Sequence, residues 1–183
     1  KKMSIVHELE KINPKFLQNK VIGFDENFIN QTEMASQLWE ALKLMEQQGA
    51  VLKKISLPDL KYSVAVYYLI ATSEASANLA RYDGIHFGFR DKEHLGDLED
   101  TYIYSRTHGF GEEVRKRIIL GTFSLSSGYQ DQYFSKACKV RRKIYDNFIS
   151  TFQDVDVIFS PVCASSAFQA GEALQDPLKM YMN

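Results

Sequence analysis

The stretch VIGFDENFINQTEMASQLWEALKLMEQQGAVLKKI, residues 21–55, decides the fold of this chain. It begins with an apolar run at residues 21–24, which predicts a short buried strand. Residues 30–48 carry apolar side chains at helical spacing, and residues 51–55, before Pro58, predict a second strand. A strand, a helix and a second strand within this length predict a parallel βαβ unit.

Local signals define the ends of the predicted helix. Asn30 and Glu33 have the spacing of a capping box, which favours a start near residue 30. Gly49 stands where a helix commonly ends on a glycine. The turn after Phe24 has no run of glycines, so the unit is not predicted to bind a phosphate or a dinucleotide. Apolar residues recur along the helix at spacings of three and four, namely Ala35, Leu38, Leu42 and Met45.

Beyond Pro58 the chain is predicted to be mostly helical. The fold class is therefore α/β, with a βαβ unit followed by a helical segment. One helix follows from an apolar repeat at Val64, Tyr68, Ala71, Ala75 and Leu79. The other predicted elements are a loop at 81–93, helices at 95–106, around 115–117 and at 129–152, and a strand at 155–159.

The bulk composition is that of an ordinary folded domain. The chain has 183 residues, of which 45% are hydrophobic and 25% charged, and its net charge is -1. No global field therefore favours nucleic acid or an anionic membrane. Cations gather at 115–117 and 141–143, and each group is interpreted as a solvated helix face. No apolar run is long enough to span a bilayer.

The sequence carries none of the common catalytic or metal-binding motifs. Cys138 and Cys163 lack CxxC or zinc spacing, which favours free thiols in a reducing cytoplasm. The four histidines form no recognised ligand pair, so no metal site is predicted. There is no GxSxG turn. The serine pairs at 126–127 and 165–166 are interpreted as structural, because no general base accompanies them.

Two side chains remain as candidate binding residues, Tyr67 and Arg117. Tyr67 lies about 100° around the helix from Tyr68, which falls on the apolar face. Its hydroxyl is therefore offered to a ligand, or is satisfied within the core. Arg117 lies one helical turn after Glu113. It forms an ordinary surface pair with that carboxylate, or it offers its guanidinium to a buried one.

Longer motifs resemble a known family. From residue 20 to residue 183 they are similar to the A subunits of glutamyl-tRNA(Gln) amidotransferases, within the amidase-signature family. The matching motifs are YYLIA at 67–71, EASANLARYDG at 74–84, GFGEEV at 109–114 with Arg117-Ile118 and LGT at 120–122, SSGY at 126–129, KVRR at 139–142, and DPL at 176–178 with Met180-Tyr181.

This resemblance implies a fold and a set of site residues. The implied fold is an amidase-signature α/β/α sandwich, of which residues 20–183 form one incomplete domain after an N-terminal connector at 1–19. The family's catalytic lysine and two serines lie upstream in a Gly/Ser-rich region, so the chain resembles a C-terminal-half fragment without catalytic residues. Arg117 matches the arginine that grips the α-carboxylate of glutamine, and Tyr67 matches a tyrosine that contacts the same substrate. An acidic residue that holds the α-amino group is implied just after Asn183.

The resemblance also implies a reaction and its partners. Glutamine is hydrolysed through a seryl acyl-enzyme, and the ammonia passes to a partner protein that activates and amidates Glu-tRNA(Gln), or in some organisms Asp-tRNA(Asn). The implied partners are amidotransferase subunits B and C. ATP, magnesium and most of the tRNA contact belong to the partner, so no cofactor is expected in this chain. The implied location is the cytoplasm of a bacterium, or an organelle in a eukaryote.

Two other functions stay open at this point. The first is a non-catalytic α/β interaction module, which would bury its apolar faces within 183 residues. An incomplete domain would instead leave a broad apolar face exposed. The second is an amidase-signature hydrolase for a different amide. Tyr67 and Arg117 argue against it, because a lipid or aryl amide has no α-carboxylate to bind.

Overall fold

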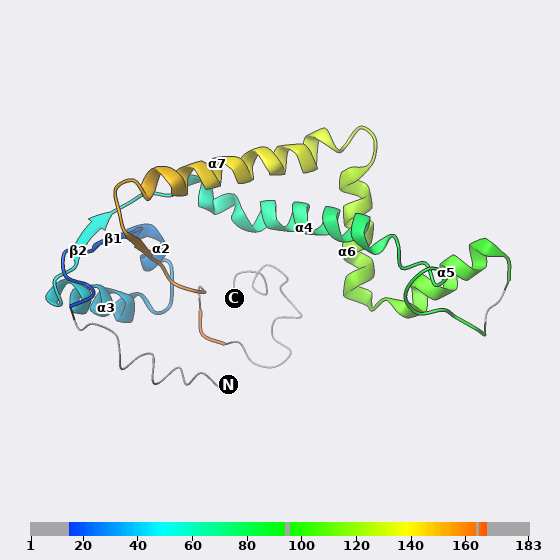
Figure 1. The fold of residues 1–183 in the computed structure, drawn as a ribbon, viewed down its shortest axis with the longest axis horizontal. Helices are drawn as coiled ribbons and strands as arrows, with labels where there is room; N and C mark the ends of the chain where they lie inside the picture. The colour runs from blue at the N-terminus through cyan, green and yellow to red at the C-terminus, as the bar shows by residue number, and fades with distance from the viewer. Residues whose placement is uncertain (1–14, 94–95, 164, 168–183) are drawn as a thin grey trace. The chain divides into compact units, whose positions relative to one another are not determined.

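The structure is a computed structural model that describes residues 15–93, 96–163 and 165–167. The chain divides into two compact units, one of residues 1–58 with 145–183 and the other of residues 59–144 (Figure 1). The predicted connector at 1–19 and the motif at 176–181 lie mostly or wholly outside the described residues. The assignment of residues 20–183 to one incomplete domain stays a prediction.

The first unit holds a three-stranded parallel sheet. Ile22 at its centre is paired with Leu52 on one side and with Val157 on the other. Both pairings are parallel, which confirms the predicted βαβ unit and the α/β fold class. In the order β2-β1-β3 the strands are β2 (Val51–Lys54), β1 (Val21–Phe24) and β3 (Val157–Phe159).

The connection between β1 and β2 contains two helices where the sequence predicts one, namely α2 (Glu26–Asn30) and α3 (Ala35–Gln47). The prediction that a capping box at Asn30 and Glu33 starts the helix is therefore wrong. The cause is Asp25, whose Oδ1 accepts a hydrogen bond from the Asn27 N–H at 3.0 Å and so starts a helix directly after the strand. Asn30 instead accepts a bond from the indole of Trp39 at 3.0 Å. Gly49, with φ of 93°, follows α3 as predicted.

A small apolar core fixes α3 against the sheet. Its side chains come from β1, α2 and α3, and the ring of Trp39 meets the ring of Phe24 edge-on at 5.5 Å. Asp25 is buried as well, and its second oxygen accepts a bond from the Leu57 N–H at 3.1 Å. The buried apolar members are Ile22, Phe24, Ile29, Leu42 and Ala50.

The second unit is helical, as predicted, although the helices begin at different residues. The helix predicted at 95–106 starts three residues later, because Asp97 caps it by accepting from the Asp100 N–H at 3.0 Å. No described helix is long and apolar enough to cross a membrane. The elements from residue 58 on are η1 (Pro58–Tyr62), α4 (Ser63–Leu79), α5 (Leu98–Gly109), α6 (Glu112–Leu125), the π-helical turn η2 (Asp131–Ser135) and α7 (Lys136–Thr151), which continues into the first unit.

The buried face of α4 differs from the predicted one. Val64 and Tyr68 of the predicted apolar stripe are only partly buried. The buried residues are Val66 and Ile70, which pack with Ala137 of α7, together with the small polar residues Thr72 and Ser73. The difference arises because two helices contact α4 on different sides, and one of these contacts uses small polar residues that apolar periodicity does not detect.

Asp156 connects the start of β1 to the chain before β3. Its Oδ2 accepts a hydrogen bond from the Val21 N–H at 2.8 Å, and its own N–H donates to the Val21 carbonyl at 2.8 Å. The Val21 N–H lowers the pKa of this carboxyl below its usual range, and the nearby ammonium of Lys20 lowers the pKa further.

We therefore expect Asp156→Asn to lower the melting temperature of the full chain slightly at neutral pH. A carboxylate with a lowered pKa stabilises the fold above its unfolded-state pKa of about 3.9, and this contribution is lost as the pH falls through the folded-state value. The difference in melting temperature between the variant and the wild type should therefore shrink in acid. Thermal melting followed by circular dichroism between neutral and acid pH measures it. Glu40→Gln, at an exposed carboxylate of α3, is the control. A deficit that does not depend on pH would contradict the role given to Asp156.

Candidate functional site

The candidate site rests on a close crossing of α4 and α6 (Figure 1). Gly121 of α6 lies directly against the backbone of α4. A Cβ atom at this position would collide with the carbonyl oxygen of Thr72 and would come within 2.7 Å of the Cβ of Ser76. Only a glycine allows the two helix backbones to approach this far, so Gly121 sets the distance between them.

Hydroxyl groups fill the crossing on both sides of Gly121. The Oγ atoms of Ser73 and Ser124 lie 2.6 Å apart and are buried, and the hydroxyls of Ser76 and Thr122 lie 2.9 Å apart. Each serine of the buried pair also lies within bonding distance of a carbonyl of its own helix. A hydroxyl has a single proton, so one serine donates to the other, which then donates to its own carbonyl. The small residues thus hold α4 and α6 in a defined register.

Tyr67 is placed on α4 outside the apolar core, with 52% of its surface exposed. It lines a cavity of about 430 Å³ between α4 and the first half of α7. The walls are mostly apolar, and Glu74 and Arg141 add charged groups. This combination is typical of sites that bind small polar molecules. The complete lining is Ser63, Val66, Tyr67, Ile70, Ala71, Glu74, Arg141 and Ile144.

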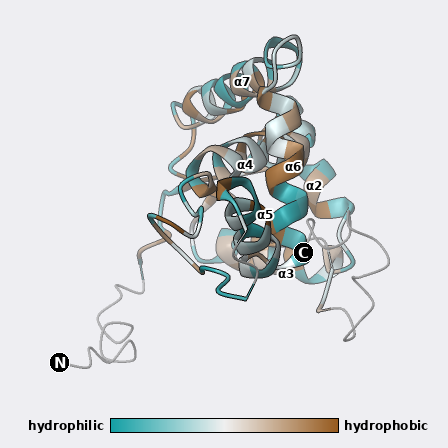
Figure 2. Cartoon of the chain, turned by 90° about the vertical axis from the view of Figure 1, so that its right-hand side faces the viewer, coloured by the Kyte–Doolittle hydropathy of each residue, from teal (hydrophilic) through white to brown (hydrophobic). Residues whose placement is uncertain are grey.

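Arg117 is placed on α6, where the surface pair with Glu113 forms. Its Nε donates to Glu113 Oε1 at 3.0 Å, and the side chains of the arginine and the glutamate are 34% and 53% exposed. An exposed pair of this kind contributes little to stability. Figure 2 shows that α6 carries strongly hydrophilic and strongly hydrophobic residues along its length.

A second ion pair on α6 lies one residue before the Arg117–Glu113 pair. Lys116 Nζ lies 2.8 Å from Glu112 Oε1. The hydrogen bond from this ammonium lowers the pKa of Glu112, and the carboxylate raises the pKa of Lys116 in return. Lys116 and Arg117 therefore each have a counter-ion one turn earlier, while Arg115 donates a hydrogen bond to the Thr107 carbonyl at 3.2 Å.

Tyr67 and Arg117 are thus carried by two helices that pack directly on each other. Arg117 is not among the described residues that line the cavity of Tyr67. The small residues at the crossing fix the position of one helix against the other, and so the position of Tyr67 relative to Arg117. The sequence analysis does not single out Gly121 or Ser124 for this role. The sequence signal that could have indicated this role is the LGT motif at residues 120–122, which contains Gly121.

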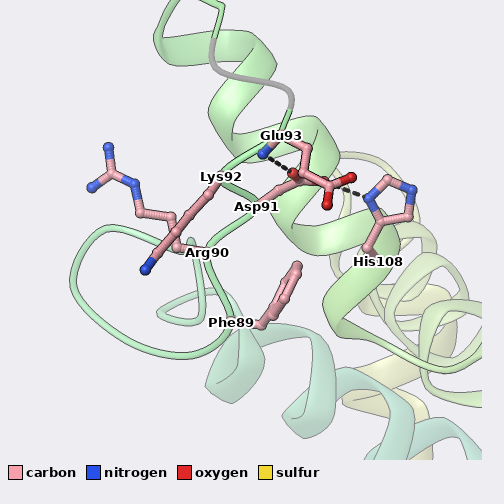
Figure 3. Close-up of a pocket in the computed structure, with 6 residues that line it drawn as sticks. All are labelled: Phe89, Arg90, Asp91, Lys92, Glu93 and His108. Atoms are coloured by element: carbon pink, nitrogen blue, oxygen red, sulfur yellow. Dashed lines mark hydrogen bonds and ion pairs between the residues drawn. The ribbon is translucent and has the colours of Figure 1, made fainter.

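The structure also forms two aspartate–histidine pairs that sequence reasoning missed. Asp91 is 5% exposed, and its Oδ2 lies 2.6 Å from His108 Nδ1 (Figure 3). Asp83 Oδ2 lies 2.8 Å from His86 Nδ1. The hydrogen bond from His86 holds the pKa of Asp83 well below its usual range. The sequence does not predict these pairs, because an aspartate 17 residues before His108 is not a recognisable spacing.

Other predicted features are placed without a catalytic role. Ser126 ends α6, where its hydroxyl donates to the Phe123 carbonyl at 2.7 Å. Cys138 and Cys163 are free thiols. Within residues 15–93, 96–163 and 165–167 no three His, Cys, Asp or Glu side chains are grouped so that they could hold a metal ion.

Comparison with known proteins places the chain in a family. The family model described as Amidase matches residues 1–183, so the chain belongs to the amidase family. It is 45% identical over 181 residues to the A subunit of glutamyl-tRNA(Gln) amidotransferase from Persephonella marina, a match that covers 97% of this chain. It is 52% identical over 144 residues, or 79% of this chain, to the protein of the same name from Lactiplantibacillus plantarum.

A solved structure agrees with this placement. The A subunit of glutamyl-tRNA(Gln) amidotransferase from Thermotoga maritima matches 90% of this chain with a TM-score of 0.60 and 36% identity. The expectation of an amidase-signature fold is therefore confirmed. The chain spans only about a third of the proteins it matches: 37% of the Persephonella marina protein, 29% of the Lactiplantibacillus plantarum protein and 31% of the Thermotoga maritima chain.

The crossing leads to a prediction about Gly121. We expect Gly121→Ala to destabilise the full chain by about 2 kcal/mol or more, because an added methyl group forces the backbones of α4 and α6 apart. Thermal or urea unfolding measures the change.

Gly111→Ala is the matched control for this variant. Gly111 has a φ of -64°, and a Cβ there would meet nothing within 4 Å. Equal melting temperatures for the two variants would show that the close approach at Gly121 does not stabilise the unit.

Proposed function

We propose that this chain is part of the glutamine-hydrolysing A subunit of a tRNA-dependent amidotransferase and contributes to its glutamine pocket. The observation that carries the proposal is the match over 181 residues, at 45% identity, to a protein named for this activity. In the complete subunit, glutamine would be hydrolysed to supply ammonia for converting Glu-tRNA(Gln) to Gln-tRNA(Gln). The catalytic lysine and serines would come from outside these residues.

Arg117 is proposed to bind the α-carboxylate of glutamine. A guanidinium presents several N–H donors in a planar fork that fits a carboxylate bidentately. Glu113 accepts a hydrogen bond from Nε of this guanidinium. The Glu113 carboxylate would then orient the guanidinium, and the helix crossing would fix the distance of Arg117 from α4.

Tyr67 is proposed to contact the same substrate through its hydroxyl. Its ring is anchored on α4, shortly before the small-residue crossing, and its exposed edge faces a cavity with charged groups. A phenol gives a rigid hydrogen-bonding group at small entropic cost. Neither residue would take part in the bond-breaking step, so both would act on substrate binding.

Exposed apolar residues favour an incomplete domain over a free-standing interaction module. On α6 alone, Ile119, Leu120 and Phe123 are 68%, 41% and 46% exposed. Contiguous apolar surface of this kind is normally covered by other polypeptide. We propose that the rest of the amidase domain covers it, and that subunits B and C are the partners of the complete protein. The cytoplasm, where Cys138 and Cys163 stay reduced, fits this proposal as a location.

Arg117→Ala tests the assignment in the complete amidotransferase, with all its partners present. Removal of a charge-assisted, bidentate interaction should raise the KM for glutamine on the order of a hundredfold and change kcat little. Arg117→Lys should recover only part of the effect, because an ammonium lacks the planar fork.

Two controls separate substrate binding from assembly. Arg115→Ala removes a cation from the same helix and should leave the KM for glutamine unchanged. Ammonium chloride in place of glutamine should support equal amidation by wild type and Arg117→Ala, because ammonia bypasses the glutamine pocket. An unchanged KM in Arg117→Ala would refute the role of this residue.

Tyr67→Phe tests the proposed hydroxyl contact. Removing one neutral hydrogen bond should raise the KM for glutamine about tenfold. The neighbouring Tyr68→Phe is the matched control, since Tyr68 points about 100° away on the same helix.

Steady-state kinetics with glutamine and with a simple aryl amide also test the other hydrolase function. A preference for the aryl amide would overturn the assignment to glutamine.

A further inference from the structure

Two buried hydroxyl groups meet where α4 and α6 cross, at a position where small apolar side chains would fit as well. Ser73 of α4 and Ser124 of α6 are each 1% exposed, and their Oγ atoms lie 2.6 Å apart. This distance is at the short end of the range for hydrogen bonds between hydroxyls. Both residues belong to the unit of residues 59–144, so the contact is complete within the part of the chain that the structure describes.

This hydrogen bond contributes little to the stability of the unit. Both hydroxyls leave water when the helices pack, and the bond between them does little more than offset that loss. Replacement of both partners of such a bond by apolar groups of similar shape is often nearly neutral for the free energy of unfolding, whereas removal of one partner alone is destabilising. Alanine differs from serine by a single oxygen atom, so two alanines would fill nearly the same space. Stability therefore does not account for the pair.

The pair differs from an apolar contact because it has a direction. Ser73 Oγ lies 2.7 Å from the Leu69 carbonyl oxygen, and Ser124 Oγ lies 3.0 Å from the Gly121 carbonyl oxygen. These contacts within each helix orient the two hydroxyls toward each other. A hydrogen bond weakens steeply when its angle is distorted, whereas the hydrophobic effect is not directional. The pair therefore selects one register of α6 on α4.

The proposed glutamine contacts are carried by the same two helices. Tyr67 precedes Ser73 by six residues, and Arg117 precedes Ser124 by seven. At a rise of about 1.5 Å per residue, each contact lies roughly 10 Å along its helix from the serine pair. Both segments lie within single helices, so a slide or rotation at the crossing displaces Tyr67 relative to Arg117. A misplacement of about 1 Å can cost an enzyme about a hundredfold in rate.

We propose that Ser73 and Ser124 are positioning residues for glutamine. Their hydrogen bond holds α4 and α6 in the register in which Tyr67 and Arg117 reach the same substrate molecule. Both serines are buried, so they act through these two side chains and not by contact with glutamine. The inference rests on the proposed function of Tyr67 and Arg117, and it adds that the serine pair supports substrate affinity and not stability.

The double variant Ser73→Ala/Ser124→Ala tests this in the complete amidotransferase with all its partners. Its melting temperature should equal or slightly exceed that of the wild type, because neither hydroxyl remains buried without the other. Its KM for glutamine should rise about tenfold with little change in kcat, because the register is no longer fixed. Each single variant should also raise the KM, but should lower the melting temperature. Amidation driven by ammonium chloride should equal that of the wild type.

Two further measurements separate positioning from a general loosening of the crossing. Ser76→Ala removes the second hydroxyl contact of the same crossing, which lies 2.9 Å from Thr122 and is exposed. Because this contact is open to water, its loss should leave the KM for glutamine unchanged. In an Arg117→Ala background the double serine variant should lose most of its effect on KM, because the serines act through the position of Arg117.

Each result decides the inference. It is supported by a raised KM at an unchanged melting temperature, with the effect lost in the Arg117→Ala background. An unchanged KM in the double serine variant, while Arg117→Ala raises the KM, would overturn the inference and leave the proposed function in place. An unchanged KM in both would overturn both. A lower melting temperature of the double variant, loss of ammonium-driven amidation, or an equal rise of KM in Ser76→Ala would assign the serines a purely structural role and so overturn the inference.

Discussion

The close approach of α4 to α6 is the constraint on which the helical unit depends. Gly121 brings the two backbones into contact, and the paired hydroxyls of Ser73 and Ser124 keep them in register. A helix that approaches its neighbour this closely cannot slide or rotate without a steric clash or an unpaired buried hydroxyl. The two proposed glutamine contacts, Tyr67 and Arg117, lie on these helices. Their relative position therefore follows from small residues that make no contact with substrate.

Charge in this unit is balanced locally, and the balance decides which groups remain for binding. On α6 each cation of the pairs Lys116–Glu112 and Arg117–Glu113 has a carboxylate one turn away. In the loop between α4 and α5, Asp83 accepts hydrogen bonds from backbone N–H groups and Asp91 contacts His108, and the three cations of the loop are matched by three carboxylates. Net charge alone conceals both arrangements, because it sums groups that are already paired with groups that face solvent.

Agreement between sequence and structure was closest where the signal is local. The strand at residues 21–24 and the glycine after α3 are as predicted, since alternation, apolar runs and a positive φ depend on neighbouring residues. The helix of the βαβ unit was misjudged because Asp25 caps a separate turn directly after the strand. The buried face of α4 was misjudged because a polar contact with α6 replaces part of the apolar stripe.

The sequence by itself determined the α/β class, the parallel βαβ unit and the resemblance that led to the amidase family, and it gave the i,i+4 pairing of Arg117 with Glu113 as one of two alternatives. Each of these is encoded in short-range spacing or in long motifs that are read along the chain. Only the tertiary structure decided that α4 meets α6 at a single glycine and that Asp91 binds His108. These features join residues that are distant along the chain, and their energies depend on burial and distance, which a linear pattern does not contain.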